Sequence, residues 1–178
     1  MLLNHKPTAT RLGAGHCSHL RELQDARVDS ILVGSCAEFL NGAPVLVGDI
    51  DVVHSRDTAN IARLLGVLET LDAVYRPQPY LRKKPTASHL ASHGQQNLIT
   101  QHGPLDLLGT IGRDLSYEDL LPHSVELEVG KGLRLRVLGL EMSIAIREQV
   151  AGEKDRAVLP ILRRTLEEKR LEEKRKAR

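Results

Sequence analysis

Hydrophobic and polar side chains follow two different periods along this chain, and each period predicts its own kind of element. Between residues 57 and 71, apolar side chains recur at spacings of three and four, which predicts a helix that Ser55 or Asp57 can cap. Residues 125–129 and 133–137 instead alternate strictly between apolar and charged side chains. The Gly-Lys-Gly turn between these stretches predicts a hairpin with one apolar face, and with Glu and Arg side chains opposed on the other.

Shorter apolar runs, bounded by turn residues, supply the remaining elements. We expect further strands over residues 29–33, 45–54, 97–101 and 104–109, and further helices over residues 19–26, 36–40, 116–122, 140–150 and 153–170. Pro160 lies inside the last helix and predicts a kink there or a later start. Residues 1–15 and 75–88 are rich in turn-forming residues, so both segments are expected to be irregular.

This order of elements predicts an α/β (α+β) fold, in which a small mixed sheet is flanked by helices. The length of 178 residues favours a single domain over residues 1–178. Residues 20–139 would form its core, and residues 140–178 would form C-terminal helices with a charged tail. In the tail, acidic and basic residues are paired at helical spacing, which is typical of a solvated helix.

The composition narrows the class of protein. Hydrophobic residues make up 41% of the chain but aromatic residues only 2%, so Leu, Val, Ile and Ala must build the core. Few aromatic rings and a net charge of +2 weigh against long nucleic acids as partners, which are bound by stacking and by basic surfaces. Cys17 and Cys36 lack a metal-binding spacing, and no apolar run approaches the roughly 18 residues of a membrane span. We therefore expect a cytoplasmic protein with reduced thiols and no membrane partner.

Two carboxylates at positions i and i+2 are the clearest chemical feature of the chain. Asp49 and Asp51 lie in the strand expected over residues 45–54, where side chains alternate between faces, so both should point the same way. Like charges side by side repel each other unless a cation lies between them, and carboxylate oxygens suit Mg²⁺. The alternative is a structural pair neutralised by basic side chains, and the sequence shows no such basic pair nearby.

A glycine and a serine end the apolar strand that precedes this pair. Gly34-Ser35, a helix and then Asp-x-Asp on the next strand resemble the nucleotidyltransferase superfamily, whose core is the palm of DNA polymerase β. Later segments are similar to its bacterial branch of minimal nucleotidyltransferases and toxins of toxin–antitoxin systems. They are residues 100–109, which hold a Leu-Asp-Leu triplet around Asp106, and residues 116–120, 138–141 and 153–155.

The resemblance implies a role for each of these residues. Gly34 and Ser35 would contact the phosphates of a nucleotide. Asp49 and Asp51 would hold one or two Mg²⁺ or Mn²⁺ ions on the triphosphate, and Asp106 would bind metal and accept a proton from the acceptor hydroxyl. Each also has a plainer interpretation from the sequence: Gly34-Ser35 fits an ordinary turn with Ser35 as N-cap, and Asp106 fits a turn carboxylate.

Two cations would complete the nucleotide site. The resemblance places Lys154 near the nucleotide, with Arg147 as a second candidate, whereas Lys154 and Asp155 also fit a surface ion pair. The basic segment Arg82-Lys83-Lys84 fits either a lid over a substrate or a solvated loop. The sequence leaves these alternatives open.

The implied activity is metal-dependent transfer of a nucleoside monophosphate from an NTP, such as ATP, to an acceptor hydroxyl, with release of pyrophosphate. The acceptor could be a protein side chain, an RNA end or a small molecule, and a protein partner of the antitoxin type is plausible. The alternative is a catalytically weak or inactive protein on the same fold, which binds nucleotides or acts through a toxin–antitoxin complex. A metal-dependent phosphohydrolase fits Asp-x-Asp but not the Gly-Ser turn.

Overall fold

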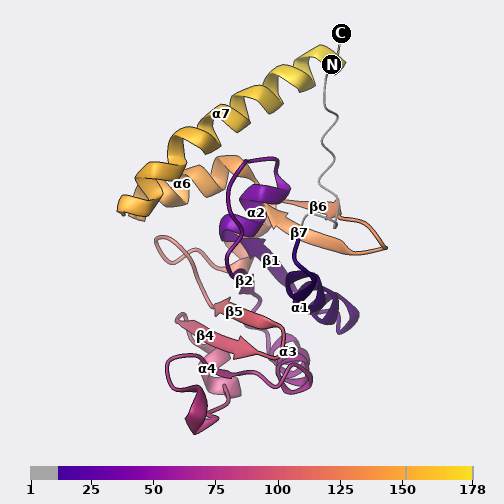
Figure 1. Ribbon diagram of the computed structural model, residues 1–178, viewed down its shortest axis with the longest axis vertical. Coiled ribbons are helices and arrows are strands. Elements are labelled where there is room, and N and C mark those ends of the chain that lie inside the picture. The colour runs from indigo at the N-terminus through magenta and orange to yellow at the C-terminus, as the bar shows by residue number, and fades with distance from the viewer. Residues whose placement is uncertain (1–11, 151, 178) are drawn as a thin grey trace.

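The computed structural model describes residues 12–150 and 152–177, apart from the side chain of Lys154. They form a seven-stranded mixed sheet flanked by helices, which confirms the expected α/β fold (Figure 1). The strands are β1 (Ser30–Val33), β2 (Ile50–His54), β3 (Val74–Tyr75), β4 (Gln95–Thr100), β5 (Gly103–Leu108), β6 (Ser124–Glu128) and β7 (Arg134–Leu138). The helices are α1 (Ala14–Asp25), α2 (Gly34–Leu40), α3 (Thr58–Thr70), α4 (Ala87–Ala91), α5 (Tyr117–Leu120), α6 (Leu140–Val150) and α7 (Glu153–Lys176), with 3-10 turns η2 (Pro79–Leu81) and η3 (Leu121–His123).

The strands lie in the order β3-β4-β5-β2-β1-β7-β6. At the centre, β2 runs antiparallel to β1 and parallel to β5, and β1 runs parallel to β7. The pairing of β2 with β5 sets Asp51 opposite Asp106. Two carboxylates that are 55 positions apart in the chain therefore meet on neighbouring strands.

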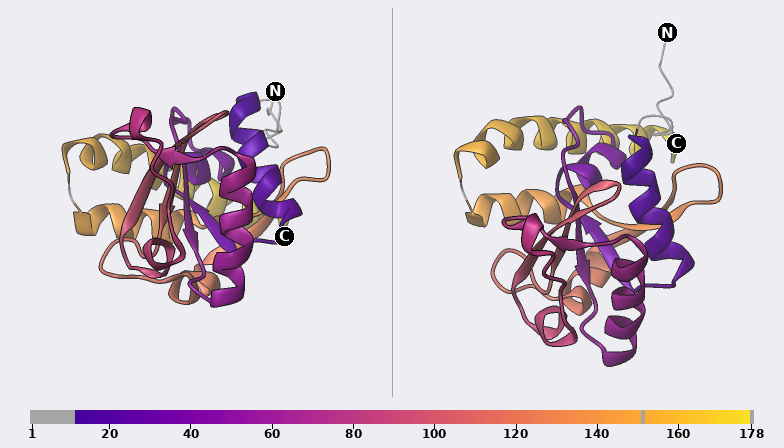
Figure 2. Two further views of the ribbon diagram at one scale, coloured as in Figure 1. Left: turned by 90° about the horizontal axis from the view of Figure 1, so that it is seen from below. Right: turned by 60° about the horizontal axis from the view of Figure 1, so that its bottom comes forward.

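Alternating side chains divide the core between the two faces of the sheet. Leu32, Val52 and Leu107 pack into a large cluster with apolar residues of α1 and α3. Val33 and Val53 point the other way, into a smaller cluster that includes residues of α5 and α6. Figure 2 shows α6 and α7 on the opposite side of the sheet from α1 and α3. Because Asp51 and Asp106 each alternate with residues of the large cluster, their side chains lie on the α6 side.

For the last helix, the sequence predicted either a kink at Pro160 or a later start. α7 begins at Glu153, seven positions before Pro160, so the later start is wrong. Leu159 and Leu162, on either side of the proline, are buried against residues of α6. This packing keeps the helix continuous although Pro160 donates no backbone hydrogen bond.

Several boundaries also differ from the expectation. α1 begins at Ala14, within the segment expected to be irregular, of which residues 1–11 lie outside the described residues. The strand expected over residues 45–54 begins only at Ile50, and Leu46 is 94% exposed. The segment 75–88 contains η2, the first two residues of α4 and the end of β3. In the described part of the chain, no helix has both the length and the apolar character that crossing a membrane requires.

Candidate active site

The two central carboxylates come from rigid, adjacent strands. Asp51 lies in β2 and Asp106 in β5, and the parallel register places them directly opposite each other. Asp49 lies one residue before the start of β2, outside the strand that was expected to carry it. The arrangement therefore combines two carboxylates fixed by the sheet with a third on the segment that leads into it.

An arginine bridges two of these carboxylates. Arg76 donates from Nη1 to Oδ2 of Asp49 at 2.7 Å, and from Nη2 to both carboxylate oxygens of Asp106 at 2.9 and 3.0 Å. The sequence shows no basic partner for Asp49 and Asp51, and this expectation is wrong for Asp49, which pairs with Arg76. Arg76 directly follows β3, and its backbone N–H bonds the carbonyl of Asn97 on β4. Its role depends on the pairing of a two-residue strand, which left no pattern to find in the sequence.

Asp51 is the carboxylate without a partner. In the part of the chain that the structure describes, its side chain accepts no hydrogen bond and forms no ion pair. Burial raises the pKa of Asp51 to about 7, and the negative charges of Asp106 and Asp49 add to the effect. Burial also raises the pKa of Asp106, against the opposing effect of Arg76. The site thus holds more carboxylates than cations, and the excess is concentrated at Asp51.

The glycine at the start of α2 lies directly beside Asp51. Gly34 has φ +65°, and a Cβ added to it would lie 2.6 Å from Oδ2 of Asp51. The backbone angle and, above all, the close approach of Asp51 favour a residue without a side chain. The N-cap position of α2 belongs to Val33 and carries no side-chain cap, so the interpretation of Ser35 as N-cap is wrong. The left-handed glycine lets the helix begin one residue before Ser35.

Of the two basic residues expected near the nucleotide, the structure describes the contacts of Arg147 but not those of Lys154. Arg147, on α6, donates to both carboxylate oxygens of Glu38 at 2.5 and 3.0 Å, and to Oδ1 of Asp155 at 2.6 Å. Glu38 is almost fully buried, so Arg147 provides the counter-charge that this position of α2 needs. Lys154 is part of α7, but its side chain lies outside the described structure, and its role stays a prediction.

A cavity of about 240 Å³ opens beside these residues. Its polar lining includes Asp51, Gln95 and Arg147, and Gly34 forms part of its wall. Gln95 also donates from Nε2 to Oδ2 of Asp106 at 3.1 Å. The cavity therefore joins residues of α2, β2, β4 and α6 that the sequence separates widely.

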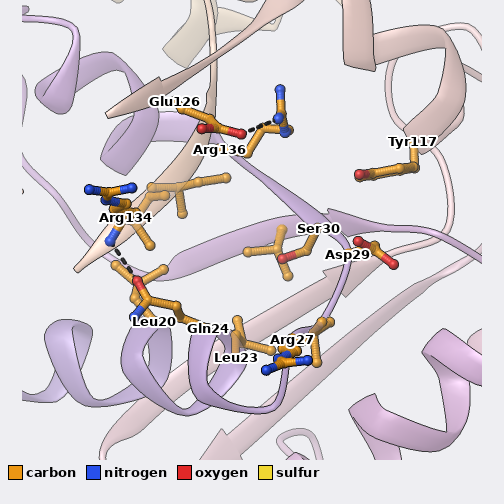
Figure 3. A pocket seen from close by; sticks show the side chains of 14 residues that line it. Leu20, Leu23, Gln24, Arg27, Asp29, Ser30, Tyr117, Glu126, Arg134 and Arg136 are labelled. Carbon is orange, nitrogen blue, oxygen red and sulfur yellow. Dashed lines mark hydrogen bonds and ion pairs between the residues drawn. The ribbon is translucent and has the colours of Figure 1, made fainter. Parts of the chain in front are cut away.

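A larger cavity of about 340 Å³ lies between α1 and the β6–β7 hairpin (Figure 3). Its charged side chains include Arg136, which is paired with Glu126 at 2.5 Å. No residue assigned a role from the sequence lines it. The chemistry therefore favours the smaller cavity, beside Asp51, as the candidate site.

Carboxylate oxygens are suitable ligands for a divalent cation, but in this structure Asp49 and Asp106 form ion pairs with Arg76. In the described ranges, no three His, Cys, Asp or Glu side chains are placed to hold a metal ion as they stand. The guanidinium of Arg76 supplies the positive charge instead. The unpartnered carboxylate of Asp51, beside two further carboxylates, is the donor set that Mg²⁺ or Mn²⁺ prefers. By the chemistry of their oxygens, these carboxylates would suit such an ion.

Comparison with known proteins supports the fold. The sequence matches no family model, and it matches no curated protein. Among solved structures, the chain is similar to a candidate nucleotidyltransferase from Thermotoga maritima, with a TM-score of 0.55 and 17% sequence identity. The match covers 94% of this chain and 99% of the other. At this identity the similarity establishes a shared nucleotidyltransferase-like fold and leaves the activity to be argued from the residues.

Proposed function

We propose that the protein is a metal-dependent nucleotidyltransferase, which moves a nucleoside monophosphate from an NTP to an acceptor hydroxyl. One observation carries the proposal: Asp51 and Asp106 face each other from parallel strands, with Gly34 packed against Asp51 and a cavity alongside. The similarity of the fold to a candidate nucleotidyltransferase is consistent with it.

Each residue has a part in this proposal. Asp49, Asp51 and Asp106 hold Mg²⁺ or Mn²⁺, which when bound supplies the positive charge that neutralises the triphosphate and the developing negative charge. Gly34 allows the phosphates to approach the backbone, and the Ser35 hydroxyl donates to a phosphate oxygen. The cavity beside Asp51 takes the nucleoside, where Val33, Leu108 and Ile146 provide apolar walls.

The proposed reaction exchanges one oxygen–phosphorus bond for another. The acceptor oxygen attacks the α-phosphorus, a new oxygen–phosphorus bond forms, and the bond to the oxygen that bridges to the β-phosphate breaks. Pyrophosphate leaves with the electron pair of that bond. Asp106 accepts the proton of the acceptor hydroxyl.

The finer assignments belong to the same proposal. They are the bacterial branch of minimal and toxin-like enzymes, a protein, RNA end or small molecule as acceptor, an antitoxin-type protein partner, and a cytoplasmic location. Arg147 lines the cavity, so it can contribute positive charge to the bound nucleotide without leaving Glu38. Lys154 keeps the same assignment.

Calorimetric titration of ATP and the other NTPs, each with Mg²⁺, tests the proposal. Wild type should bind at least one NTP in a magnesium-dependent way, and the Asp49→Asn/Asp51→Asn double variant should not. Asp72→Asn is a matched control, because Asp72 is an exposed aspartate that pairs with Arg82. It should bind as wild type does. The absence of magnesium-dependent binding to wild type would refute the proposal.

Pyrophosphate release separates transfer from binding alone. The NTP that binds is incubated with cell extract and Mg²⁺, and labelled nucleotide is followed into protein, RNA and small-molecule fractions. Incorporation by wild type and its loss in Asp106→Asn would support transfer. Binding without incorporation or pyrophosphate release would instead support the catalytically inactive alternative.

A further inference from the structure

Arg76 occupies carboxylate oxygens that belong to the proposed metal site. Its guanidinium contacts Oδ2 of Asp49 and both carboxylate oxygens of Asp106 at hydrogen-bond distances. These oxygens belong to the same carboxylates that the proposed metal ion needs. Arg76 is thus the cation that balances two of the three carboxylates, and Asp51 is left without a contact of this kind in the described structure.

A guanidinium and a metal ion compete for such oxygens. A Mg²⁺ ion binds carboxylate oxygens at about 2.1 Å and attracts the electron pairs that Arg76 now uses. Two cations held on the same carboxylates also repel each other. A metal ion that binds Oδ2 of Asp49 and the oxygens of Asp106 would therefore compete directly with the Arg76 side chain.

The tether of Arg76 allows its side chain to move away. Arg76 follows β3, which has only two residues and lies at the edge of the sheet. The eight residues after it, 77–84, are all exposed, and Tyr80 among them is 76% exposed. The Arg76 side chain is itself 34% exposed, so it can turn toward solvent without opening the core.

We propose that Arg76 is an internal competitor of the metal ion, which occupies the carboxylates at rest and is displaced when the divalent cation binds. The inference rests on the proposed function, because it concerns the same metal site. It makes the site self-inhibited: the protein is stable without metal, and occupancy depends on the metal concentration that overcomes Arg76. The coupling acts in both directions, so metal binding also releases the Arg76 side chain from the carboxylates.

Metal titration of the full-length chain tests this competition. Mn²⁺ is titrated calorimetrically into wild type, Arg76→Gln and Arg82→Gln, with and without the NTP that binds best. Arg82 is a matched control, because it belongs to the same exposed segment and pairs at 2.5 Å with Asp72, away from the carboxylates. Arg76→Gln should bind Mn²⁺ about tenfold more tightly than wild type. Arg82→Gln should match wild type.

Thermal unfolding gives a readout that does not depend on activity. In EDTA, Arg76→Gln should unfold at a lower temperature than wild type, because its carboxylates have lost their counter-charge. Mn²⁺ should restore the melting temperature of Arg76→Gln by more than it raises that of wild type. Arg76→Lys keeps one positive charge but cannot bridge two carboxylates, so its melting temperature should lie between those of wild type and Arg76→Gln. It replaces Arg76→Gln in the experiment if that variant does not fold.

The outcomes separate the two proposals. Equal or weaker Mn²⁺ binding by Arg76→Gln, with wild type binding normally, would overturn the competition and leave the nucleotidyltransferase proposal intact. Failure of wild type and of both Arg76 variants to bind Mn²⁺, even with each NTP present, would overturn the proposed metal site itself. The competition would then fail with it.

Discussion

A Cβ added to Gly34 would lie 2.6 Å from Oδ2 of Asp51, so the start of α2 and the centre of β2 are in direct contact through a residue without a side chain. We expect Gly34→Ala to destabilise the protein by about 2 kcal/mol or more. Roughly 1 kcal/mol comes from the left-handed φ of +65°, and the rest from displacing Asp51. Denaturant unfolding measures the loss, and magnesium-dependent NTP binding should fall with it.

Gly66 provides the matched control for this substitution. It lies in the exposed surface of α3, with no atom within 4 Å of an added Cβ. Gly66→Ala should therefore raise the free energy of unfolding by up to about 1 kcal/mol, because alanine is the better helix former. Equal losses in the two variants would contradict the special role of Gly34.

Asp51→Asn should separate stability from function. The wild-type carboxylate is partly buried beside two like charges and has no hydrogen-bond or ion-pair partner among the described residues. Removing its charge should raise the melting temperature of the metal-free protein at pH 8, while magnesium-dependent NTP binding is lost. Differential scanning calorimetry in EDTA and the calorimetric titration measure the two effects. A less stable metal-free variant would show that Asp51 contributes to the resting structure after all.

Arg147 should be required for stability, whatever its part in binding. Its partner Glu38 is only 2% exposed, so Arg147→Met leaves a buried carboxylate without a counter-charge and should cost about 3–5 kcal/mol. The double variant Glu38→Leu/Arg147→Met should recover much of this loss. By comparison, Arg164→Ala removes a pair whose arginine is 83% exposed, and should change stability by less than about 0.5 kcal/mol. Urea unfolding of the four proteins tests the order.

His19 should make stability sensitive to acid. Its Nε2 is hydrogen-bonded to Oγ1 of Thr100 at 2.7 Å, and burial lowers its pKa to about 4 from an ordinary value of 6.5, with smaller effects of His102 and His16. Between these pH values the unfolded chain binds more protons at this residue than the folded protein does. The free energy of unfolding therefore falls as the pH falls from 6.5 to 4, by on the order of 3 kcal/mol from this group.

Comparison with His19→Gln isolates this contribution. The glutamine keeps a hydrogen-bond donor but does not titrate, so the difference in stability between the two proteins should narrow or reverse as the pH falls. The subtraction matters because Asp51, with its raised pKa of about 7, shifts stability in the opposite direction over the same range. A constant difference between pH 7 and 4 would rule out the depressed pKa of His19.

Elements whose pattern is local could be predicted from the sequence. The β6–β7 hairpin forms with Glu and Arg side chains opposed, as expected: Glu126 lies opposite Arg136 and Glu128 opposite Arg134. Of the two caps expected for α3, Ser55 or Asp57, it is Asp57 whose side chain accepts hydrogen bonds from the first turn of the helix. Both predictions depended on neighbouring residues alone, which is where hydrophobic period and capping chemistry are informative.

The candidate site could be predicted only in part. The Asp-x-Asp spacing and the Leu-Asp-Leu triplet identified carboxylates that the sheet does bring together. Arg76 could not be found in the same way, because a two-residue strand has no hydrophobic period and its place is set by pairing with β4. The apolar run at residues 45–47 led to the prediction of a strand that begins too early. These residues lie outside the sheet, and Leu46 is exposed. The position of Arg76 and the start of β2 both depend on pairing between strands, rather than on the local pattern of the sequence.

The pairing of β1 with β7 also sets the order in which the chain can fold. Leu32 pairs with Val137, and Glu38 meets Arg147 across 109 positions of sequence. During synthesis, β1 can pair with β2, but its other edge has no partner until β7 is made, and the buried glutamate has no counter-charge until an arginine still later in the chain. Until then β1 has an open edge, so a nascent chain that stalls before residue 138 exposes an apolar strand to neighbouring chains or chaperones.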